Sequence, residues 1–169
     1  YLHSQSQPII FRDLKPSNIM VTPTGQIKLI DFGIVRFFKP GKTKDTQAIG
    51  TLGYCAPEAT SGQTDARSDI YSLCVTLHQL LTLHDPATTI YNIPPVRKLN
   101  PGVSAELERV LIKGCQNQRE QRWASATDLR MQLVQISTGG RQPPVYVTPA
   151  SSMVSASKPQ VAAASPVAP

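Results

Sequence analysis

The sequence predicts an α+β fold that is mainly α-helical, with small β-hairpins near its start and a disordered tail at its end. Three observations support this prediction. Two short apolar runs, 19–21 and 27–30, flank the turn sequence TPTG at 22–25. Apolar residues then recur at helical spacing between residues 68 and 136. Beyond that point the chain consists mainly of Pro, Ala, Ser and Val, with almost no charge.

Short strands are expected in the N-terminal part. Residues 1–4 are interpreted as the last turn of a helix, and residues 8–11 (PIIF) as a strand. The turn at 22–25 favours a hairpin, because Pro fixes one φ angle and Gly can take a positive one. Residues 39–50 (KPGKTKDTQAIG) are polar and lack periodicity, which indicates a mobile loop.

Helices are expected from residue 68 onward. The first of these helices is predicted to be buried on most sides, because its apolar residues are closely spaced. Residues 86–101 are broken by prolines and are expected to be irregular. Ser104 and Ser125 precede the next two helical patterns and are predicted N-caps, with Asp128 completing a capping box. The residues expected to face the core are Ile70, Leu73, Leu77, Leu80, Leu81, Leu107, Val110, Leu111, Cys115, Leu129, Leu133 and Ile136.

The predicted domain organisation is a folded part at residues 1–136 and a disordered linker at residues 137–169. The linker's composition offers too little apolar surface to offset the loss of chain entropy on folding. A chain that opens with Tyr1 rather than Met is expected to be a fragment of a longer product.

The composition limits which kinds of partner and which cellular compartment we expect for this chain. The net charge is +6, but Lys and Arg are spread from Arg12 to Lys158, with one local concentration at residues 39–44. We therefore expect no nucleic-acid partner. Three cysteines without CxxC spacing are typical of a reducing, cytoplasmic compartment. No apolar run approaches the roughly 20 residues that a membrane helix needs, so no membrane segment is expected.

The residues that could carry chemistry lie together in FRDLKPSNIMVTPTGQIKLIDFG, at positions 11–33. A hydroxyl that attacks a γ-phosphate needs a proton acceptor, and the nucleotide needs Mg²⁺. Asp13 lies in a polar loop after a strand and could accept the proton, while Lys15 could hold the phosphate. Asn18 and Asp31, on either side of the hairpin, offer hard oxygen ligands. Gly33 is expected to give the backbone behind Asp31 freedom to pivot.

This stretch resembles the catalytic loop and DFG motif of the bacterial eukaryotic-like (Hanks-type) serine/threonine protein kinases. Residues 56–58 (APE) match the motif that closes the family's activation segment. The resemblance runs from Tyr1 to about residue 136 and implies the C-terminal lobe of a protein kinase, with the N-terminal lobe absent. It implies ATP and Mg²⁺ as cofactors and Ser/Thr-containing proteins as substrates. The roles it implies are catalytic base for Asp13, phosphate contact for Lys15, Mg²⁺ ligands for Asn18 and Asp31, and nucleotide contact for Met20.

The resemblance also implies regulatory and structural residues. Thr51 would hydrogen-bond the catalytic loop, Asp69 would anchor that loop from the central helix, and Glu58 would pair with Arg122. Arg12 would bind a phosphorylated residue of the activation loop, and Thr43 and Thr46 are the candidate phosphosites.

Four departures from the family pattern affect these expectations. One is the stretch 84–103, which is short and proline-rich where many kinases place a substrate-docking helix. Phe11 replaces the usual histidine and is expected to stack on Phe32 of the DFG motif. Cys74 stands where glycine is common, in a helix where a small side chain should still pack. The 169 residues contain no Gly-rich loop, strand lysine or partner glutamate of an upper lobe. We therefore expect the chain alone to be inactive. The alternative is a truncated, non-catalytic kinase-like module that serves as a scaffold or binding partner.

Overall fold

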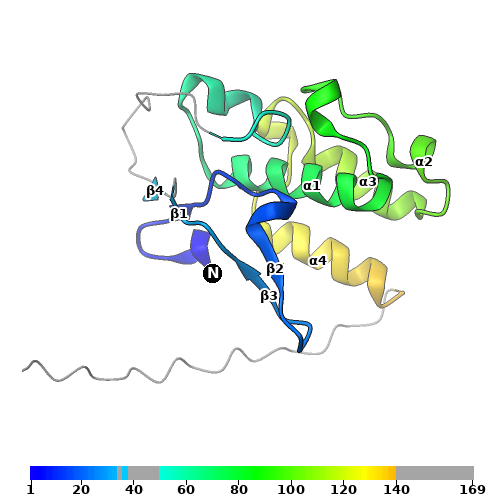
Figure 1. Ribbon diagram of the computed structural model, residues 1–169, viewed down its shortest axis with the longest axis horizontal. Helices are drawn as coiled ribbons and strands as arrows, with labels where there is room; N and C mark the ends of the chain where they lie inside the picture. The colour runs from blue at the N-terminus through cyan, green and yellow to red at the C-terminus, as the bar shows by residue number, and fades with distance from the viewer. Residues whose placement is uncertain (34–35, 38–49, 140–169) are drawn as a thin grey trace, which may run out of the picture.

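The computed structural model describes residues 1–33, 36–37 and 50–139, and these form a mainly helical α+β fold, as predicted (Figure 1). The α-helices are α1 (Ala66–Thr82), α2 (Val96–Leu99), α3 (Ala105–Gly114) and α4 (Ala126–Ser137). The strands are β1 (Ile9–Ile10), β2 (Ile19–Val21), β3 (Ile27–Leu29) and β4 (Arg36–Phe37). Short 3-10 helices are η1 (Leu2–Ser4), η2 (Pro16–Asn18), η3 (Pro57–Ser61), η4 (Pro86–Thr89) and η5 (Arg119–Gln121).

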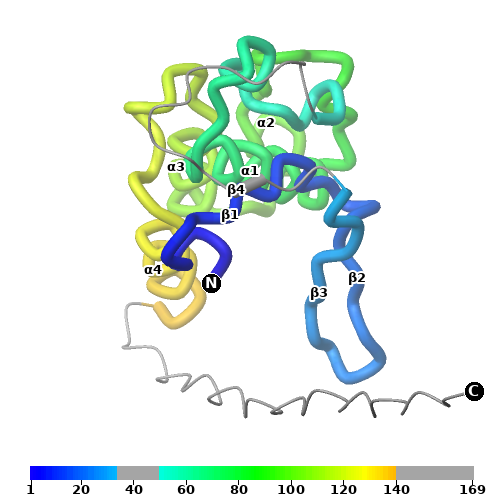
Figure 2. The backbone as a smooth tube through the Cα atoms, turned by 90° about the vertical axis from the view of Figure 1, so that its left-hand side faces the viewer, coloured from blue at the N-terminus to red at the C-terminus, as the bar shows by residue number. Residues whose placement is uncertain are grey.

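The β2–β3 hairpin confirms the prediction made from its turn. The two strands are antiparallel, with Ile19 opposite Leu29 and Val21 opposite Ile27. Gly25 takes a positive φ of 77°, which a residue without a side chain adopts at little cost. Figure 2 shows the hairpin extending away from the helical part of the molecule. A second small antiparallel sheet pairs β1 with β4.

Helix α1 lies at the centre of the fold and contacts α2, α3, α4 and β1. It begins earlier than its apolar pattern indicated, because Asp65 caps it. The Asp65 side chain accepts from the N–H of Arg67, and Ser68 Oγ accepts from the N–H of Asp65. These local bonds satisfy donors that the helix itself leaves open. The N-cap Asp65 therefore lies three residues before the start predicted at residue 68.

Both predicted serine caps are confirmed. Ser104 Oγ accepts from the N–H of Leu107 at 3.2 Å, and Ser125 Oγ accepts from the N–H of Asp128 at 3.1 Å. The Asp128 carboxylate accepts from the Ser125 hydroxyl at 2.8 Å. This bond between the two side chains adds to the cap of α4. The prediction for 86–101 is wrong in part, since η4 and α2 both lie within that stretch.

The main core lies between α1, α3 and α4 and includes Ile70, Cys74, Val110, Leu111 and Leu129. Cys74 is fully buried. It stands where the family commonly has glycine, and the residue it faces on α3 is itself a glycine, Gly114. A Cβ atom on Gly114 would lie 2.1 Å from Cys74 Sγ. The thiol therefore fills space that the neighbouring helix leaves open.

Leu80 does not belong to the core, contrary to its helical spacing. Its side chain is 59% exposed in the last turns of α1, and Leu83 just beyond the helix is 88% exposed. Helical periodicity gives the face on which a residue lies, but other elements decide whether that face is covered. Among the residues that the structure describes, no helix has the length and apolar character needed to cross a membrane.

Candidate active site

Asp13 lies at the centre of a cluster of hydrogen bonds from two segments of the chain, residues 13–18 and Thr51. Its Oδ1 accepts from Thr51 Oγ1 at 2.6 Å, and its Oδ2 accepts from Asn18 Nδ2 at 2.9 Å. Lys15 Nζ lies 2.8 Å from Oδ2 of Asp13 and also donates to Thr51 Oγ1 at 2.6 Å. The structure thus brings together four of the residues that the sequence analysis selected.

These contacts set the charge state of Asp13. Partial burial alone would raise the pKa of this carboxyl, but the hydrogen bonds from Lys15, Thr51 and Asn18 and the charge of Lys15 outweigh it. The pKa of Asp13 is therefore lowered from its ordinary value, and the carboxylate is ionised at neutral pH. An ionised carboxylate within hydrogen-bonding reach of incoming groups is able to accept a proton.

The loop before Asp13 is held to α1 by Asp69. The N–H of Phe11 donates to Asp69 Oδ2 at 2.8 Å, and the N–H of Arg12 donates to Oδ1 at 2.7 Å. Arg12 has a φ of 73°, in the left-handed region that a residue with a long side chain rarely adopts. Such a strained conformation persists only where surrounding contacts hold it in place. The two hydrogen bonds to Asp69 are contacts of this kind.

His3 is a further member of this arrangement that the sequence analysis did not select. Its Nε2 lies 2.8 Å from Asp69 Oδ2, across 66 positions of sequence. Burial raises the pKa of Asp69 in spite of the contacts from His3 and the Phe11 N–H. No local pattern links residues 3 and 69, so only the fold could show that His3 supports the anchor of the loop.

Asn18 and Asp31 lie at neighbouring ends of the β2–β3 hairpin. The N–H of Ile30 donates to the carbonyl of Asn18 at 2.9 Å, which places Asp31 one residue from this link. Asp31 takes a φ of 61°, and its Oδ1 accepts from the N–H of Gly33 at 3.2 Å. A Cβ atom on Gly33 would lie 3.1 Å from Oδ1 of Asp31.

The predicted freedom of the backbone at Gly33 stays a prediction, and the structure shows which residue near it is left-handed. It is absent from the residues with positive φ in the described part of the chain, and the left-handed residue is Asp31 itself. Aspartate tolerates this conformation better than most residues with a side chain. The lack of a side chain at Gly33 leaves room for the carboxylate of Asp31.

The residues at this end of the hairpin are chemically suited to Mg²⁺. Asn18 Nδ2 donates to the backbone carbonyl and to Oδ2 of Asp13, both at 2.9 Å, which leaves the amide oxygen on the other side of the group. Mg²⁺ is commonly held by one or two carboxylates together with substrate phosphates and water. The described residues contain no group of three or more His, Cys, Asp or Glu placed for a metal, so phosphate oxygens would have to complete such a site.

Three apolar residues of the 11–33 stretch were also selected from the sequence: Met20, Phe11 and Phe32. Met20 lies on β2 opposite Lys28 and is 45% exposed. Phe11 is buried and meets Phe32 edge to face, with ring centroids 5.2 Å apart and an interplanar angle of 89°. The phenylalanine that replaces the family's usual histidine therefore contacts the DFG phenylalanine by an arrangement that aromatic pairs favour.

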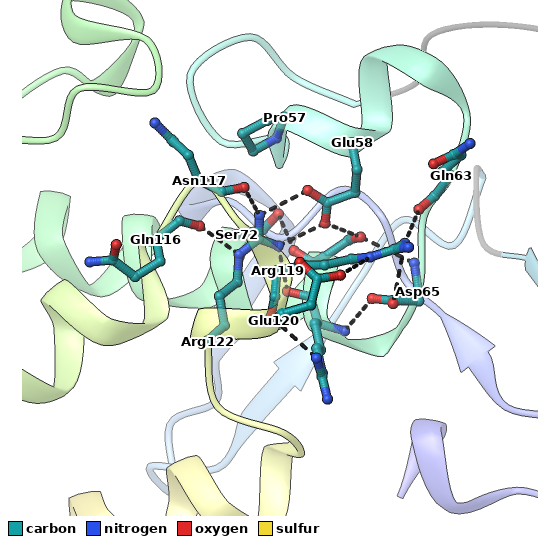
Figure 3. Close-up of polar contacts among 12 residues, drawn as sticks. Pro57, Glu58, Gln63, Asp65, Ser72, Gln116, Asn117, Arg119, Glu120 and Arg122 are labelled. Atoms are coloured by element: carbon teal, nitrogen blue, oxygen red, sulfur yellow. Dashed lines mark hydrogen bonds and ion pairs between the residues drawn. The ribbon is translucent and has the colours of Figure 1, made fainter.

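Glu58 and Arg122 form a bidentate ion pair (Figure 3). Arg122 Nη1 donates to Oε1 at 2.7 Å, and Nη2 donates to Oε2 at 2.8 Å. Arg122 is buried and also donates to the carbonyls of Gln116 and Asn117. Burial alone would raise the pKa of Glu58, but Arg122 and the Ser68 hydroxyl lower it overall.

Of the candidate regulatory residues Arg12, Thr43 and Thr46, the structure describes only Arg12. Arg12 is buried, and its Nη2 donates to Thr64 Oγ1 at 2.8 Å, a contact that the sequence analysis did not foresee. Thr43 and Thr46 lie outside the residues that the structure describes. Their assignment as phosphosites stays a prediction.

An aspartate with a nearby lysine, followed by an asparagine and a second aspartate at the end of a hairpin, is the order of residues that carries the resemblance to protein kinases. Residues 1–134 match the protein kinase domain family, and the chain belongs to it. Over 157 residues it is 37% identical to the serine/threonine-protein kinase PknB of Mycobacterium tuberculosis, and over 156 residues 35% identical to PknB of Mycobacterium leprae. It is 33% identical over 146 residues to the probable serine/threonine-protein kinase SCO3848 of Streptomyces coelicolor.

These alignments cover most of this chain and a small part of each relative. They take in 83% of the chain and 25% of either PknB, and 78% of the chain and 22% of the Streptomyces protein. The chain thus spans about a quarter of the length of the curated relatives it matches. The family-level prediction of a bacterial Hanks-type serine/threonine kinase sequence is confirmed.

Proposed function

We propose that residues 1–136 form the C-terminal lobe of an ATP-dependent protein serine/threonine kinase. The observation that carries this proposal is the cluster of Asp13, Lys15, Asn18 and Thr51, linked by hydrogen bonds of 2.6–2.9 Å. The reaction would transfer the γ-phosphate of ATP to a Ser or Thr hydroxyl of a protein substrate. Residues 137–169, which are rich in Pro, Ala and Ser, would be a disordered linker.

Each residue of the cluster has a proposed role in this reaction. Asp13 is ionised and would accept the proton of the attacking hydroxyl, while Thr51 and Asn18 fix the direction of its carboxylate. Lys15 would shift from Asp13 toward the transferring phosphate and offset its negative charge. Met20 would contact the nucleotide with its exposed side chain.

Asn18 and Asp31 would hold Mg²⁺, whose chemistry is to neutralise the charge on the nucleotide phosphates. The open carboxamide oxygen of Asn18 and the nearby Asp31 support this assignment. Phosphoryl transfer depends mostly on positioning and electrostatics. Because the 169 residues contain no Gly-rich loop or strand lysine to hold the nucleotide from above, we expect little phosphate transfer from this chain alone.

A phosphotransfer assay tests the proposal. The chain would be joined to an upper lobe with a Gly-rich loop and strand lysine, and phosphate incorporation into a Ser/Thr protein would be measured. Asp13→Asn should lower incorporation by about a hundredfold or more, because the proton acceptor is lost. Asp128→Asn, in the cap of α4, is the matched control and should retain activity.

Equal incorporation by Asp13→Asn and the unchanged protein would reject the assignment of Asp13. If phosphate incorporation did not depend on Asp13 and the chain still bound an intact kinase, the result would support the alternative function as a non-catalytic scaffold.

A further inference from the structure

A groove of about 700 Å³ lies between α3 and α4 and shares no residue with the Asp13 cluster. The two helices pack against each other (Figure 1), and Trp123, from the loop before α4, forms part of the groove's wall. A volume of this size is within the range of roughly 300–1,000 Å³ that is usual for ligand sites. None of the roles proposed above uses this groove.

The indole of Trp123 is fixed in the groove before any ligand arrives. Its Nε1 donates to the carbonyl of Val110 at 3.1 Å, and the ammonium of Lys113 lies 4.0 Å from the ring centroid. Val110 and Ile136 add aliphatic surface beside the ring. Because these side chains are already ordered, a ligand that covers them loses little of its binding free energy to ordering the site.

The polar groups of the groove suit an uncharged ligand with free carbonyl groups. Gln132 and Gln135 of α4 line the groove, and in the part of the chain that the structure describes neither carboxamide has a hydrogen-bond partner. The charged residues that line it are Glu106, Arg109 and Lys113. Since Glu106 and Arg109 pair with each other at 3.3 Å, the groove has no strong preference for an acidic or a basic ligand.

The chain itself contains a segment with these properties. Gly139, the last residue that the structure describes, lines the groove. Residues 143–149 (PPVYVTP) follow closely, carry no charge, and include Tyr146, which is the only aromatic residue after Trp123. Consecutive prolines favour the extended polyproline II conformation, whose carbonyls have no internal partners. Proline-rich segments of this kind bind grooves lined by aromatic side chains.

We propose that residues 143–149 bind in the α3–α4 groove of the same chain, with the ring of Tyr146 against Trp123. Tyr146 is seven residues beyond Gly139, a reach of up to about 23 Å, whereas the ten residues of α3 span about 15 Å. Such a short tether gives an effective concentration in the millimolar range, so a Kd of about 0.1 mM for the free segment would suffice. The inference goes beyond the proposed phosphate transfer and leaves residues 150–169 as the linker.

NMR spectroscopy of the full 169-residue chain tests the inference. Trp123 is the only tryptophan, so its indole N–H gives a single peak. Tyr146→Ala should shift this peak and the carboxamide peaks of Gln132 and Gln135, because the bound ring is lost. Met153→Ala, later in the same tail, is the matched control and should leave all three unchanged. In the unchanged protein, the Tyr146 ring should show nuclear Overhauser effects to Ile136.

Competition by a free peptide of residues 143–149 makes the test quantitative. The peptide should bind the Tyr146→Ala chain with a Kd of about 0.1 mM and the unchanged chain about tenfold more weakly, because there the tethered segment occupies the groove. Adding Gln135→Ala to the Tyr146→Ala chain should weaken the peptide further. Adding Met131→Ala instead should not, since Met131 is exposed on α4 and does not line the groove.

Three outcomes would overturn the inference. They are an indole peak that Tyr146→Ala does not move, equal affinity of the free peptide for the unchanged and Tyr146→Ala chains, and Overhauser effects that vanish on dilution. The last result would show that the segment comes from a second copy of the chain. A failure of the proposed phosphate transfer would leave all of these measurements unaffected.

Discussion

Glu58 and Arg122 are 64 positions apart and are joined by two hydrogen bonds, of 2.7 and 2.8 Å. The pair links η3, which follows the Thr51 segment, to the loop before α4. Ser68 Oγ donates to Glu58 Oε1 at 2.7 Å, so the first turn of α1 joins the same network. Three segments around the helical core are therefore held to one another through the carboxylate of Glu58.

We expect Arg122→Met to lower the free energy of unfolding by about 3 kcal/mol or more. The substitution would leave Glu58 partly buried without its partner, and removing one member of a buried ion pair is strongly destabilising. Urea denaturation followed by circular dichroism would measure the change. Arg109→Met is the control, because Arg109 and Glu106 form an exposed pair, and such pairs contribute little to stability. Similar losses for both variants would contradict the structural role of the buried pair.

The same pair should make stability depend on pH. The pKa of Glu58 is lowered in the folded chain, so its ionised form is stabilised by folding. This contribution is fully present above the ordinary pKa of 4.5 and is lost as the pH falls through the lowered folded value. The stability difference between the unchanged protein and Glu58→Gln should therefore be constant near neutral pH and narrow below about pH 4.5. Urea midpoints measured across this range would check it, and a difference that widened in acid would be inconsistent with the pair.

Gly114→Ala should destabilise the chain, although Ala normally favours a helix over Gly. The new Cβ would lie 2.1 Å from Cys74 Sγ, in a core that has no space for it. Overpacking of this kind costs about 1–3 kcal/mol. Cys74→Gly in the same chain should recover part of the loss, which a double-mutant cycle in urea would show as coupling. Additive effects would mean that the two residues do not compete for the same space.

Thr51→Val should raise the pKa of Asp13. The substitution removes the hydroxyl that donates to Asp13 Oδ1 at 2.6 Å, and a donor to a carboxylate favours its ionised form. Carbon-detected NMR titration of the Asp side chains would report the shift. Thr51→Ser keeps a hydroxyl and should shift the pKa less, while Thr24→Val, in the exposed β2–β3 turn, should not change it. A pKa of Asp13 that stayed the same in Thr51→Val would show that Lys15 and Asn18 are sufficient.

The sequence by itself determined those features that depend on residues close together in the chain. The hairpin turn at 22–25, the caps at Ser104 and Ser125, and the spacing of Asp13, Lys15, Asn18 and Asp31 were all readable there, because turns and caps are formed by hydrogen bonds across a few residues. The pairings of Asp69 with the catalytic loop and of Glu58 with Arg122 were foreseen only through the family resemblance.

Only the tertiary structure decided what lies between distant segments. His3 reaches Asp69, Gly114 makes room for Cys74, and Leu80 is exposed beside Lys15 although its spacing predicted a buried side chain. Periodicity assigns a residue to one face of a helix, but the packing of other elements determines whether that face meets protein or solvent. For that physical reason, the exposure of Leu80 could not be predicted from the order of the residues alone.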